Sequence, residues 1–482
     1  MIRFEKIFIG GQWMSSAGTE VFRLTSPHDG QVVGECPAAS SEDMGRAIQA
    51  ARQSFDEGAW RRAQPEKRQE VIARFAALYD ARSDEFAQFI TAENGSPLWF
   101  TSAVQYCIAL QNTAYLKVAA DYPWELEQNA IPTGSTLWRR EPVGVVAAII
   151  PWNTPHQSAL VKIIPALLTG CSVVLKLAPE TALDGQFLGD LFIEAGLPTG
   201  VLSIVAASRD VSQSLVTHPE VDKIAFTGST ATGKRIASLA GAQLKRVSLE
   251  LGGKSAAILL EDADIEGTAS TLAYASLANS GQSCTAQSRI LVPRNREGAF
   301  ADAFCTVVKG MTVGNPADPQ TFVGPLVSEM QRKRVAKYIE LGIREGAHLA
   351  IGGAGRPQGL RHGHYVRPTV FMRVSNEMRV AREEIFGPVT CIIAYDDITE
   401  AVQIANDSPY GLSGSVWTND SMRGLDVAKR ILTGMFSVNG AGPDFLAPFG
   451  GFKQSGLGRE FGSEGLGAYV EHKAIFFEPK AT

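Results

Sequence analysis

Short apolar runs alternate with helical stretches through the middle of this chain. Four runs rich in Val, Ile, Ala and Leu are separated by segments whose apolar residues recur at the three-and-four spacing of a helix. These runs are Val143–Ile150, Ser172–Leu175, Leu202–Val205 and Asp222–Phe226. Because they are continuous, we expect both faces of each strand to be covered. The pattern predicts an α/β fold in which helices cover a parallel sheet on both sides.

The second half of the chain repeats this alternation and predicts a second sheet. Its candidate strands are Ala256–Leu260, Ile290–Val292, Val389–Tyr395, Gly414–Trp417 and Met435–Val438. The candidate helices lie near Ile265–Leu277, Ser328–Gly342, Ile398–Asn406 and Ser421–Ile431. Residues 123–141 lose the pattern and contain Pro132 and Gly134, which predicts a connector or an arm. Tyr469–Phe477 is typical of an edge strand that needs a partner, and another subunit could supply it.

Length and charge limit the partners that we expect. A chain of 482 residues has room for about two to four domains, and its net charge of −5 does not favour nucleic acid or an anionic membrane. The longest apolar run, Val143–Ile150, falls far short of the ~20 residues that span a bilayer, and no export signal is evident. The six cysteines are scattered, and His362 and His364 have no further ligands nearby. We expect a cytoplasmic protein without a metal.

Residues at the ends of the predicted strands could carry chemistry, because ligands collect at the carboxyl ends of parallel strands. Asn153 follows the first strand, where its amide could donate to an oxyanion or simply form a turn. Lys176 ends the second strand and could hold a ribose or a phosphate, or be an ordinary surface lysine. The turn Phe226–Gly233 could bind phosphate through free N–H groups, although short side chains also suit a bare turn.

Two further segments each contain a single reactive side chain. Cys284 stands among small polar neighbours that leave a thiol room to meet a substrate, although a loop cysteine without a role also fits. Glu250 is the one carboxylate in the apolar run that leads to Gly252 and Gly253. Burial without a partner would raise its pKa and suit a general base, whereas a structural salt bridge is the alternative.

Six segments together resemble the NAD(P)-dependent aldehyde dehydrogenase superfamily. They follow the order found in that family and span nearly the whole chain. The segments are Pro151–Asn153, Phe226–Thr230, Leu249–Gly253, Gly281–Cys284, Glu383–Pro388 and Pro448–Glu460. Six independent matches make a chance resemblance negligible. The resemblance implies two Rossmann-like α/β domains, one for the cofactor and one for catalysis, with a small β arm for oligomerisation.

The resemblance also implies roles for four residues. Cys284 would attack the aldehyde carbon to give a thiohemiacetal, and Asn153 with the Cys284 backbone N–H would hold its oxyanion. Glu250 would activate the water that hydrolyses the thioacyl-enzyme, and Glu460 matches a second glutamate that relays protons in some members. Two alternatives stay open. An acylating enzyme would pass the thioester to coenzyme A, which Glu250 disfavours, and a catalytically silent member would act as a structural or binding protein.

The family pattern implies an NAD(P) site as well. The pyrophosphate would lie near Ser229, the adenosine ribose near Lys176 and the nicotinamide ribose on Glu384. NAD-preferring members often carry a glutamate three residues after this lysine, where this chain has Pro179, with Glu180 one step later. We expect NAD, with NADP as the alternative. The implied cofactor residues are Ile150, Trp152, Lys176, Glu180, Phe226, Thr227, Gly228, Ser229, Gly233, Leu251, Glu384 and Phe386.

The substrate pocket is the part that the resemblance defines least. Its implied residues are Thr154, Gln157, Ser158, Val161, Phe445 and Phe449. The first four stand where family members often carry aromatic or bulky side chains, and the two phenylalanines could form an apolar wall. No arginine is evident beside Cys284 to hold a second carboxylate. We expect a medium-sized apolar aldehyde as the small-molecule partner.

The resemblance finally divides the chain into parts. Residues 1–121 and 143–249 would form the NAD(P)-binding domain and 250–439 the catalytic domain. Residues 122–142 and 460–482 would form the oligomerisation arm, with 440–459 as a linking segment. Because such an arm joins subunits, we expect a homodimer or a homotetramer.

Overall fold

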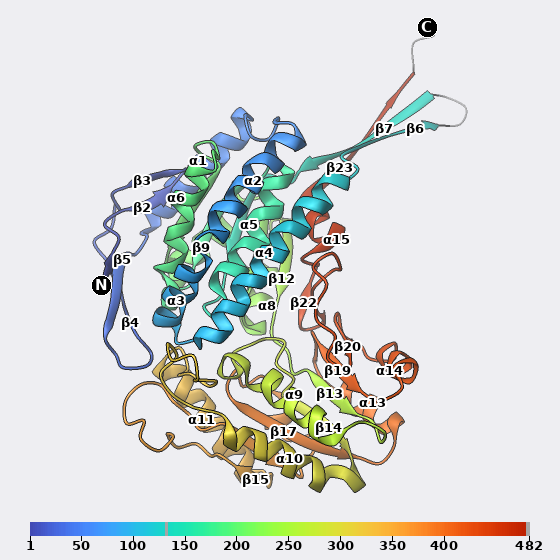
Figure 1. The fold of residues 1–482 in the computed structure, drawn as a ribbon. Coiled ribbons are helices and arrows are strands. Elements are labelled where there is room, and N and C mark those ends of the chain that lie inside the picture. Colours follow the sequence, from blue (N-terminus) through green and yellow to red (C-terminus); the bar gives the residue numbers. More distant parts are fainter. Residues whose placement is uncertain (131–133, 479–482) are drawn as a thin grey trace.

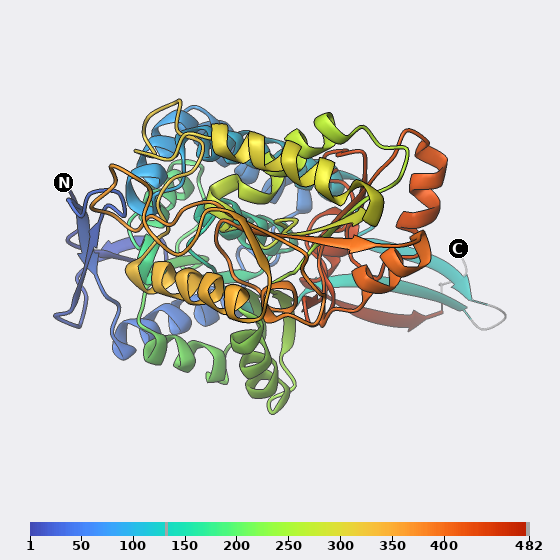
Figure 2. The same cartoon turned by 90° about the horizontal axis from the view of Figure 1, so that it is seen from below.

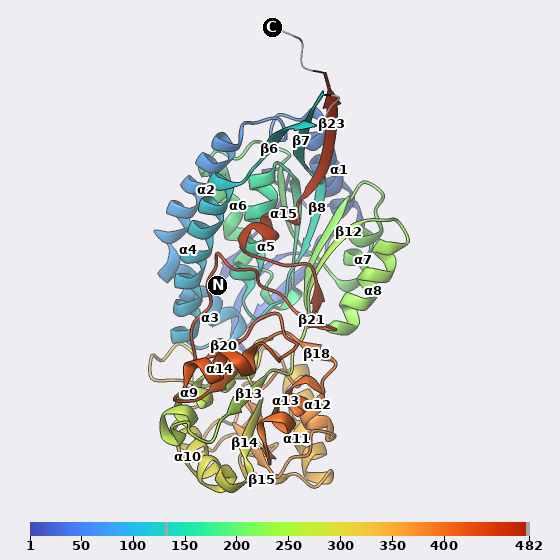
Figure 3. The ribbon, with the colours of Figure 1, turned by 90° about the vertical axis from the view of Figure 1, so that its right-hand side faces the viewer.

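Two large sheets, each with its own helices, form the body of the molecule (Figure 1). The computed structural model describes residues 1–130 and 134–478. An eight-stranded sheet lies in the upper part of Figure 1 and a seven-stranded sheet in the lower part. Figure 3 shows the same two bodies from the side, one above the other. The predicted α/β class with two sheets is therefore confirmed.

The eight-stranded sheet contains the four strands predicted between residues 143 and 226. Its order is β22-β12-β11-β8-β9-β10-β2-β3, and the strands from β12 to β10 run parallel. Their bounds are β2 Ile7–Ile9, β3 Gln12–Met14, β8 Val145–Ile149, β9 Ser172–Leu177, β10 Leu202–Ala206, β11 Lys223–Thr227, β12 Arg246–Glu250 and β22 Gly456–Leu457. Val146 and Ala148 join the core on one face, whereas Val145 and Ala147 join the core on the other. This explains the continuous apolar runs.

Helices cover both faces of this sheet. One face carries α2 Pro65–Asp80, α4 Leu98–Asp121, α5 Pro155–Thr169 and α6 Phe187–Glu194, with α3 Ser83–Asn94 beside them. The other carries α1 Ser41–Glu57, α7 Arg209–Thr217 and α8 Thr230–Gly241. The apolar spacing predicts a helix over Leu183–Ala195, but the observed helix is shorter because Asp184–Gln186 forms a 3-10 turn before α6. In α5, Pro155 occupies the first turn, where its missing N–H costs nothing.

The seven-stranded sheet has the order β15-β16-β17-β14-β13-β19-β20. Its bounds are β13 Ala256–Leu259, β14 Arg289–Pro293, β15 His348–Ile351, β16 Thr369–Met372, β17 Val389–Tyr395, β19 Gly414–Trp417 and β20 Ser437–Val438. Its helices are α9 Ile265–Leu277, α10 Glu297–Gly310, α11 Glu329–Arg344, α12 Arg379–Arg382, α13 Ile398–Asn406 and α14 Ser421–Ala428. Seen from below, α10 and α11 lie on opposite sides of the sheet (Figure 2).

Several details of this half differ from the prediction. β20 is shorter than the expected Met435–Val438, and α14 ends at Ala428 rather than Ile431. Three elements of this half, α10, β15 and β16, were not predicted. β15 and β16 are four-residue strands on the sheet's edge side. In α10 the buried residues recur at helical spacing, but Gly298 and the pair Val307–Val308 weaken the helical signal.

A three-stranded arm projects from the body at the top of Figure 1. Its strands are β6 Glu125–Ala130, β7 Gly134–Pro142 and β23 Val470–Phe477, in the antiparallel order β23-β7-β6. Of the two expectations for residues 123–141, a connector or an arm, the arm is confirmed, and the polar residues of β6 and β7 suit strands that have no helix over them. The terminal strand finds its partner in β7 of the same chain. Residues 131–133 and 479–482 of the expected arm lie outside the described residues.

The N-terminal region adds a small sheet of its own. β1 Ile2–Arg3, β5 Val32–Pro37 and β4 Val21–Thr25 pair in that order, while β2 and β3 form a hairpin on the large sheet. Short β-like pieces alternate with Gly-rich and Pro-rich turns in residues 7–35, which predicts a hairpin region, and these strands confirm it. Throughout residues 1–130 and 134–478, every helix is too short or too polar to cross a membrane.

Candidate active site

The predicted site residues gather at the carboxyl ends of the first sheet's strands. Asn153 follows β8, Lys176 lies at the end of β9, and Glu250 ends β12. The backbone N–H of Gly228, after β11, donates to the Glu250 carbonyl oxygen at 3.0 Å. On its other side, β12 pairs with β22, where Glu250 lies opposite Gly456. The C-terminal segment is therefore held against this edge of the sheet.

The Glu250 side chain is buried without a hydrogen bond. It is 4% exposed, and neither carboxyl oxygen has a partner among the described residues. Burial raises the pKa of this carboxyl well above its usual range, and the nearby charge of Glu460 adds to the effect. The carboxyl packs against Gly450, where a Cβ would lie 2.7 Å from Oε1. The structural salt bridge considered as an alternative is absent among the described residues.

Glu460 differs from Glu250 because it has a partner. Its Oε1 lies 2.6 Å from Nζ of Lys162, which also donates to Oγ1 of Thr227 at 2.6 Å. The Lys162 side chain is fully buried. Lys162 was not among the predicted site residues, although it is a lone charge inside the apolar segment of α5, which is the same kind of signal that singled out Glu250.

Cys284 lies in a loop with unusual backbone geometry. Asn279, Ser280 and Gly281 precede it with φ of 52°, 57° and 71°, and a Cβ at Gly281 would lie 2.2 Å from the Gly387 carbonyl oxygen. Only glycine fits there, since both the φ and the close approach exclude a side chain. A Cβ at Gly253 would likewise meet the Cys284 carbonyl oxygen at 2.6 Å. The glycines thus pack this loop against the residues that follow Glu250.

Asn153 is tied to the same loop. Its Nδ2 donates to the Gln282 carbonyl oxygen at 3.0 Å, and Asn279 Nδ2 donates to the Asn153 carbonyl oxygen at 3.3 Å.

Burial raises the pKa of the Cys284 thiol to about 12, helped by the charges of Glu384 and Glu250. The thiol is therefore protonated at neutral pH and needs a base before it can attack.

Glu384 lies on the other side of the two glycines. Its Oε1 accepts from the backbone N–H of Gly253 at 3.1 Å, and a Cβ at Gly252 would lie 2.3 Å from Oε2. Burial raises the pKa of this carboxyl as well. Phe386, with φ of 62°, sets its ring edge-on to Trp152 at 5.4 Å between centroids. The turn Gly252–Gly253 therefore separates Cys284 from Glu384.

The remaining predicted cofactor residues follow the same sheet edge. Ser229 caps the N-terminus of α8, where its hydroxyl accepts from the Thr232 N–H. Burial lowers the pKa of Lys176 to about 8, and Glu180 opposes that shift. A cation, a carboxylate and a helix N-terminus along one sheet edge fit a dinucleotide. The others are at the strand ends or beside them: Ile150 after β8, Phe226 and Thr227 in β11, Gly228 after it, and Leu251 packed against Gly233.

Comparison with known proteins gives the family. The model of the aldehyde dehydrogenase family matches residues 13–475. The chain belongs to the aldehyde dehydrogenase family. Geranial dehydrogenase of Castellaniella defragrans is 43% identical to it over 476 residues, which cover 98% of this chain and 99% of that protein. The predicted family and enzyme class are thereby confirmed.

Solved structures of other aldehyde dehydrogenases superpose closely on this one. An enzyme of Mycobacterium tuberculosis with NAD+ has a TM-score of 0.97 at 42% identity, covering 100% of this chain and 99% of that chain. A cysteine-to-alanine mutant from Pseudomonas syringae with NAD+ and octanal has a TM-score of 0.95 at 39% identity, covering 99% and 98%. The predicted aldehyde dehydrogenase-like fold is confirmed by this similarity.

In this aldehyde dehydrogenase the predicted pocket residues form two groups. Thr154, Gln157, Ser158 and Val161 lie at the start and along the first turns of α5, and Oγ1 of Thr154 is 3.3 Å from Oγ of Ser158. Phe445 and Phe449 come from the C-terminal side and pack on Phe461 with centroid distances of 5.1 and 5.6 Å.

Two residues that were not predicted, Phe461 and Tyr115, join these groups. Phe461 packs on Tyr115 of α4 at 5.9 Å between ring centroids, and the Tyr115 hydroxyl donates to the Val161 carbonyl oxygen at 3.3 Å. The aromatic wall therefore reaches α5 through Tyr115. Phe461 directly follows the matching segment Pro448–Glu460, and Tyr115 lies outside all six segments. Only the fold could therefore reveal the contact between them.

Proposed function

We propose that this enzyme oxidises an aldehyde to the carboxylic acid with NAD+ through a covalent bond to Cys284. The observation that carries the proposal is the unpaired, buried carboxyl of Glu250 at the same sheet edge as the loop of Cys284. A buried carboxyl with a raised pKa can take a proton near neutral pH, which is what both the thiol and a hydrolytic water require.

Cys284 and Asn153 would carry the first step. Once its proton is removed, the Cys284 sulfur attacks the aldehyde carbon and the carbonyl oxygen becomes an oxyanion. The second hydrogen of Asn153 Nδ2, whose first is directed at Gln282, and the Cys284 backbone N–H supply donors for that charge. Such donors are typically worth about 10²–10³ in rate. NAD+, when bound, accepts the hydride that leaves the tetrahedral carbon.

Glu250 would carry the second step. It takes a proton from water, the resulting hydroxide attacks the thioester carbon, and the carbon–sulfur bond breaks to release the acid and the thiolate. Glu460 and Lys162 stand next to Glu250 and could pass its proton onward. Because Glu250 would activate water, it disfavours the alternative of transfer to coenzyme A.

The cofactor site is proposed on the same sheet edge. The N-terminus of α8 at Ser229 would hold the pyrophosphate, Lys176 the adenosine ribose, and Glu384 the nicotinamide ribose beside Phe386. Both neighbours described above were crystallised with NAD+. We expect NAD+ rather than NADP+, since Glu180 lies close enough to Lys176 to affect its pKa and would repel a 2′-phosphate.

The substrate would be a medium-sized apolar aldehyde. The aromatic group Phe445, Phe449 and Phe461 supports this, as do relatives that act on geranial or bind octanal.

Residues 1–121 and 143–249 would bind the cofactor, and 250–439 would carry catalysis. The arm would join two or four subunits, because Phe476 is 79% exposed on β23. A monomer in sedimentation at micromolar concentration would contradict that assembly.

A panel of aldehydes tests the function directly. We expect NADH formation with apolar aldehydes of about eight to ten carbons, a higher kcat/KM than for charged short semialdehydes, and free acid as the product. The parallel reaction with coenzyme A should give no acyl-CoA. The absence of NADH with every aldehyde, although the protein is folded, would overturn the proposal in favour of a silent member.

A further inference from the structure

A small cavity lies beside Asn153, between α4 and the start of α5. Its volume of about 10 Å³ is room for one water-sized group. Ile90, Phe100 and Val104 give it apolar walls. Gln105 and Thr154 are among its polar lining, and the Gln105 side chain is 4% exposed. The cavity thus lies next to the residue that would hold the aldehyde oxygen.

One end of the Gln105 amide is fixed by a buried chain of polar contacts. The end assigned as Oε1 lies 2.5 Å from the Tyr79 hydroxyl, which lies 2.8 Å from Nδ1 of His156. Nε2 of His156 is in turn 3.0 Å from the Asp184 carbonyl oxygen. The other end of the Gln105 amide has no hydrogen-bond partner among the described residues. A buried polar atom of this kind is costly unless something pairs with it.

The available protons decide which end of the amide is free. His156 is buried and neutral, because burial lowers its pKa to about 4, so it carries one ring proton. That proton must be on Nε2, which faces a carbonyl oxygen, and Nδ1 must therefore accept the single proton of Tyr79. The Tyr79 oxygen can then only accept from Gln105. The amide NH₂ therefore faces Tyr79, since amide oxygen and nitrogen are assigned by their partners.

The free end of Gln105 is consequently its carbonyl oxygen, a buried acceptor in the lining of the cavity. We propose that Gln105 determines specificity by accepting a hydrogen bond from a hydroxyl or N–H group that the substrate carries beyond its aldehyde. This rests on the proposed function, in which Asn153 binds the reacting end of the substrate. It narrows the substrate class to apolar aldehydes with one hydrogen-bond donor, because the cavity admits a single small group between apolar walls.

Paired benzaldehydes test this proposal. The probes carry a hydroxymethyl group in the meta or para position, each compared with its methoxymethyl counterpart, which keeps the oxygen but has no donor. We expect one hydroxymethyl isomer to exceed its counterpart about fivefold in kcat/KM, as one net hydrogen bond allows. In Gln105→Leu this ratio should fall to about one. The ratio is measured within each variant, so a general loss of activity does not affect it.

A second variant covers the case in which Gln105→Leu does not fold. Tyr79→Phe removes the hydroxyl that orients the amide, so the Gln105 amide can turn and the ratio should fall there too. Equal ratios in the wild-type protein and both variants would overturn the proposal, as would a wild-type protein that shows no preference for either donor isomer. Oxidation of unsubstituted benzaldehyde by the wild-type protein separates these results from a failure of the proposed function itself.

Discussion

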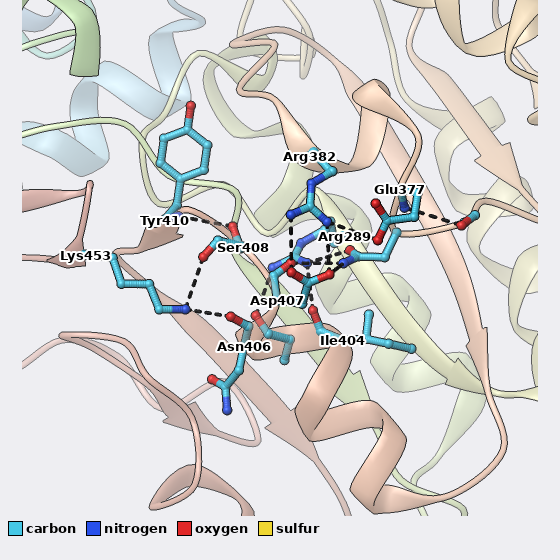
Figure 4. Close-up of polar contacts among 12 residues, drawn as sticks. Arg289, Glu377, Arg382, Ile404, Asn406, Asp407, Ser408, Tyr410 and Lys453 are labelled. Carbon is cyan, nitrogen blue, oxygen red and sulfur yellow. Dashed lines mark hydrogen bonds and ion pairs between the residues drawn. The ribbon is translucent and has the colours of Figure 1, made fainter.

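Two buried charged side chains on either side of the Gly252–Gly253 turn, Arg289 and Glu250, differ in their hydrogen-bond partners. Arg289 is 2% exposed and donates to the carbonyl oxygen of Lys254, the residue that follows the turn. It also donates to the carbonyl oxygens of Ile404 and Ala405 and to the Asn376 side chain. Figure 4 shows how this cluster continues to Arg382 and Asp407. Before the turn, the Glu250 carboxyl is as deeply buried but has no hydrogen bond among the described residues.

This difference distinguishes a structural charge, Arg289, from a reactive one, Glu250. We call the Glu250 side of the turn the reactive end and the Arg289 side the structural end. Arg289 meets backbone oxygens at the C-terminal end of α13, where a helix dipole favours a cation. Lys453 donates to the Ser408 carbonyl oxygen just beyond the same end (Figure 4). A charge satisfied on every side stabilises the fold, whereas one left without partners keeps its acceptors free for a substrate or a water. The contrast can be tested from both ends.

Removing the thiol should have the largest effect at the reactive end. We expect Cys284→Ala to lower kcat/KM by at least about 10⁴, because the alanine methyl group cannot form the covalent bond. NADH absorbance with an apolar aldehyde measures it. The matched control is Cys107→Ala, a half-buried cysteine on α4 away from this loop, which should retain wild-type activity. Activity above a hundredth of wild type in Cys284→Ala would refute the role of this thiol.

Replacing the unpaired carboxyl should come next in size. Glu250→Gln keeps the shape but cannot take a proton, so we expect kcat to fall about 10²–10⁴. Because burial raises the pKa of Glu250, the wild-type rate should decline as the pH falls through that raised pKa and the base is protonated. The variant should lack this limb. The same pH profile in both proteins would show that another group titrates.

The structural end of the turn should respond in stability. Arg289→Met leaves several buried carbonyl oxygens without a donor, and we expect a loss of about 3–5 kcal/mol in the apparent free energy of unfolding. Urea unfolding followed by fluorescence measures it. Arg382→Met, at the more exposed edge of the same cluster, serves as control and should cost about 0–1 kcal/mol. Similar losses in both variants would mean that burial does not set the importance of these cations.

Sequence reasoning could find the reactive end but not the structural one. Cys284 stood out because its neighbours are small and polar, and Glu250 because it is the one carboxylate in an apolar run, and the family resemblance then implied their roles. The parallel strands were predictable because both faces are covered, so each strand is a continuous apolar run. Arg289, at the start of a strand, looked like an ordinary boundary residue. Its acceptors lie 87 to 116 positions later in the chain, apart from Lys254, and only the fold brings them together.

The same limit explains what was missed around the active site. Lys162 could have been recognised as a lone charge in an apolar helix, but its partners Thr227 and Glu460 are far away in the sequence. For β6 and β7 the residues alone predicted a connector or an arm, and only the family resemblance implied strands, because these segments are polar and pair mainly with each other and with β23. Local sequence patterns predict helices and strands, whereas the pairing of a buried charge depends on residues that are distant in the sequence.

The smallest expected effect tests whether the unpaired carboxyl costs stability. The pKa of Glu250 is raised in the folded protein above its unfolded value of about 4.3, so the folded state holds a proton that the unfolded state has lost. Wild-type stability should therefore decrease as the pH rises from the unfolded pKa towards the raised one, and Glu250→Gln should lack this slope. We expect the variant to gain about 1 kcal/mol at pH 8 and little at pH 5, measured by urea unfolding. Parallel pH profiles would mean that Glu250 does not titrate on folding, and the contrast with Arg289 would then rest on geometry alone.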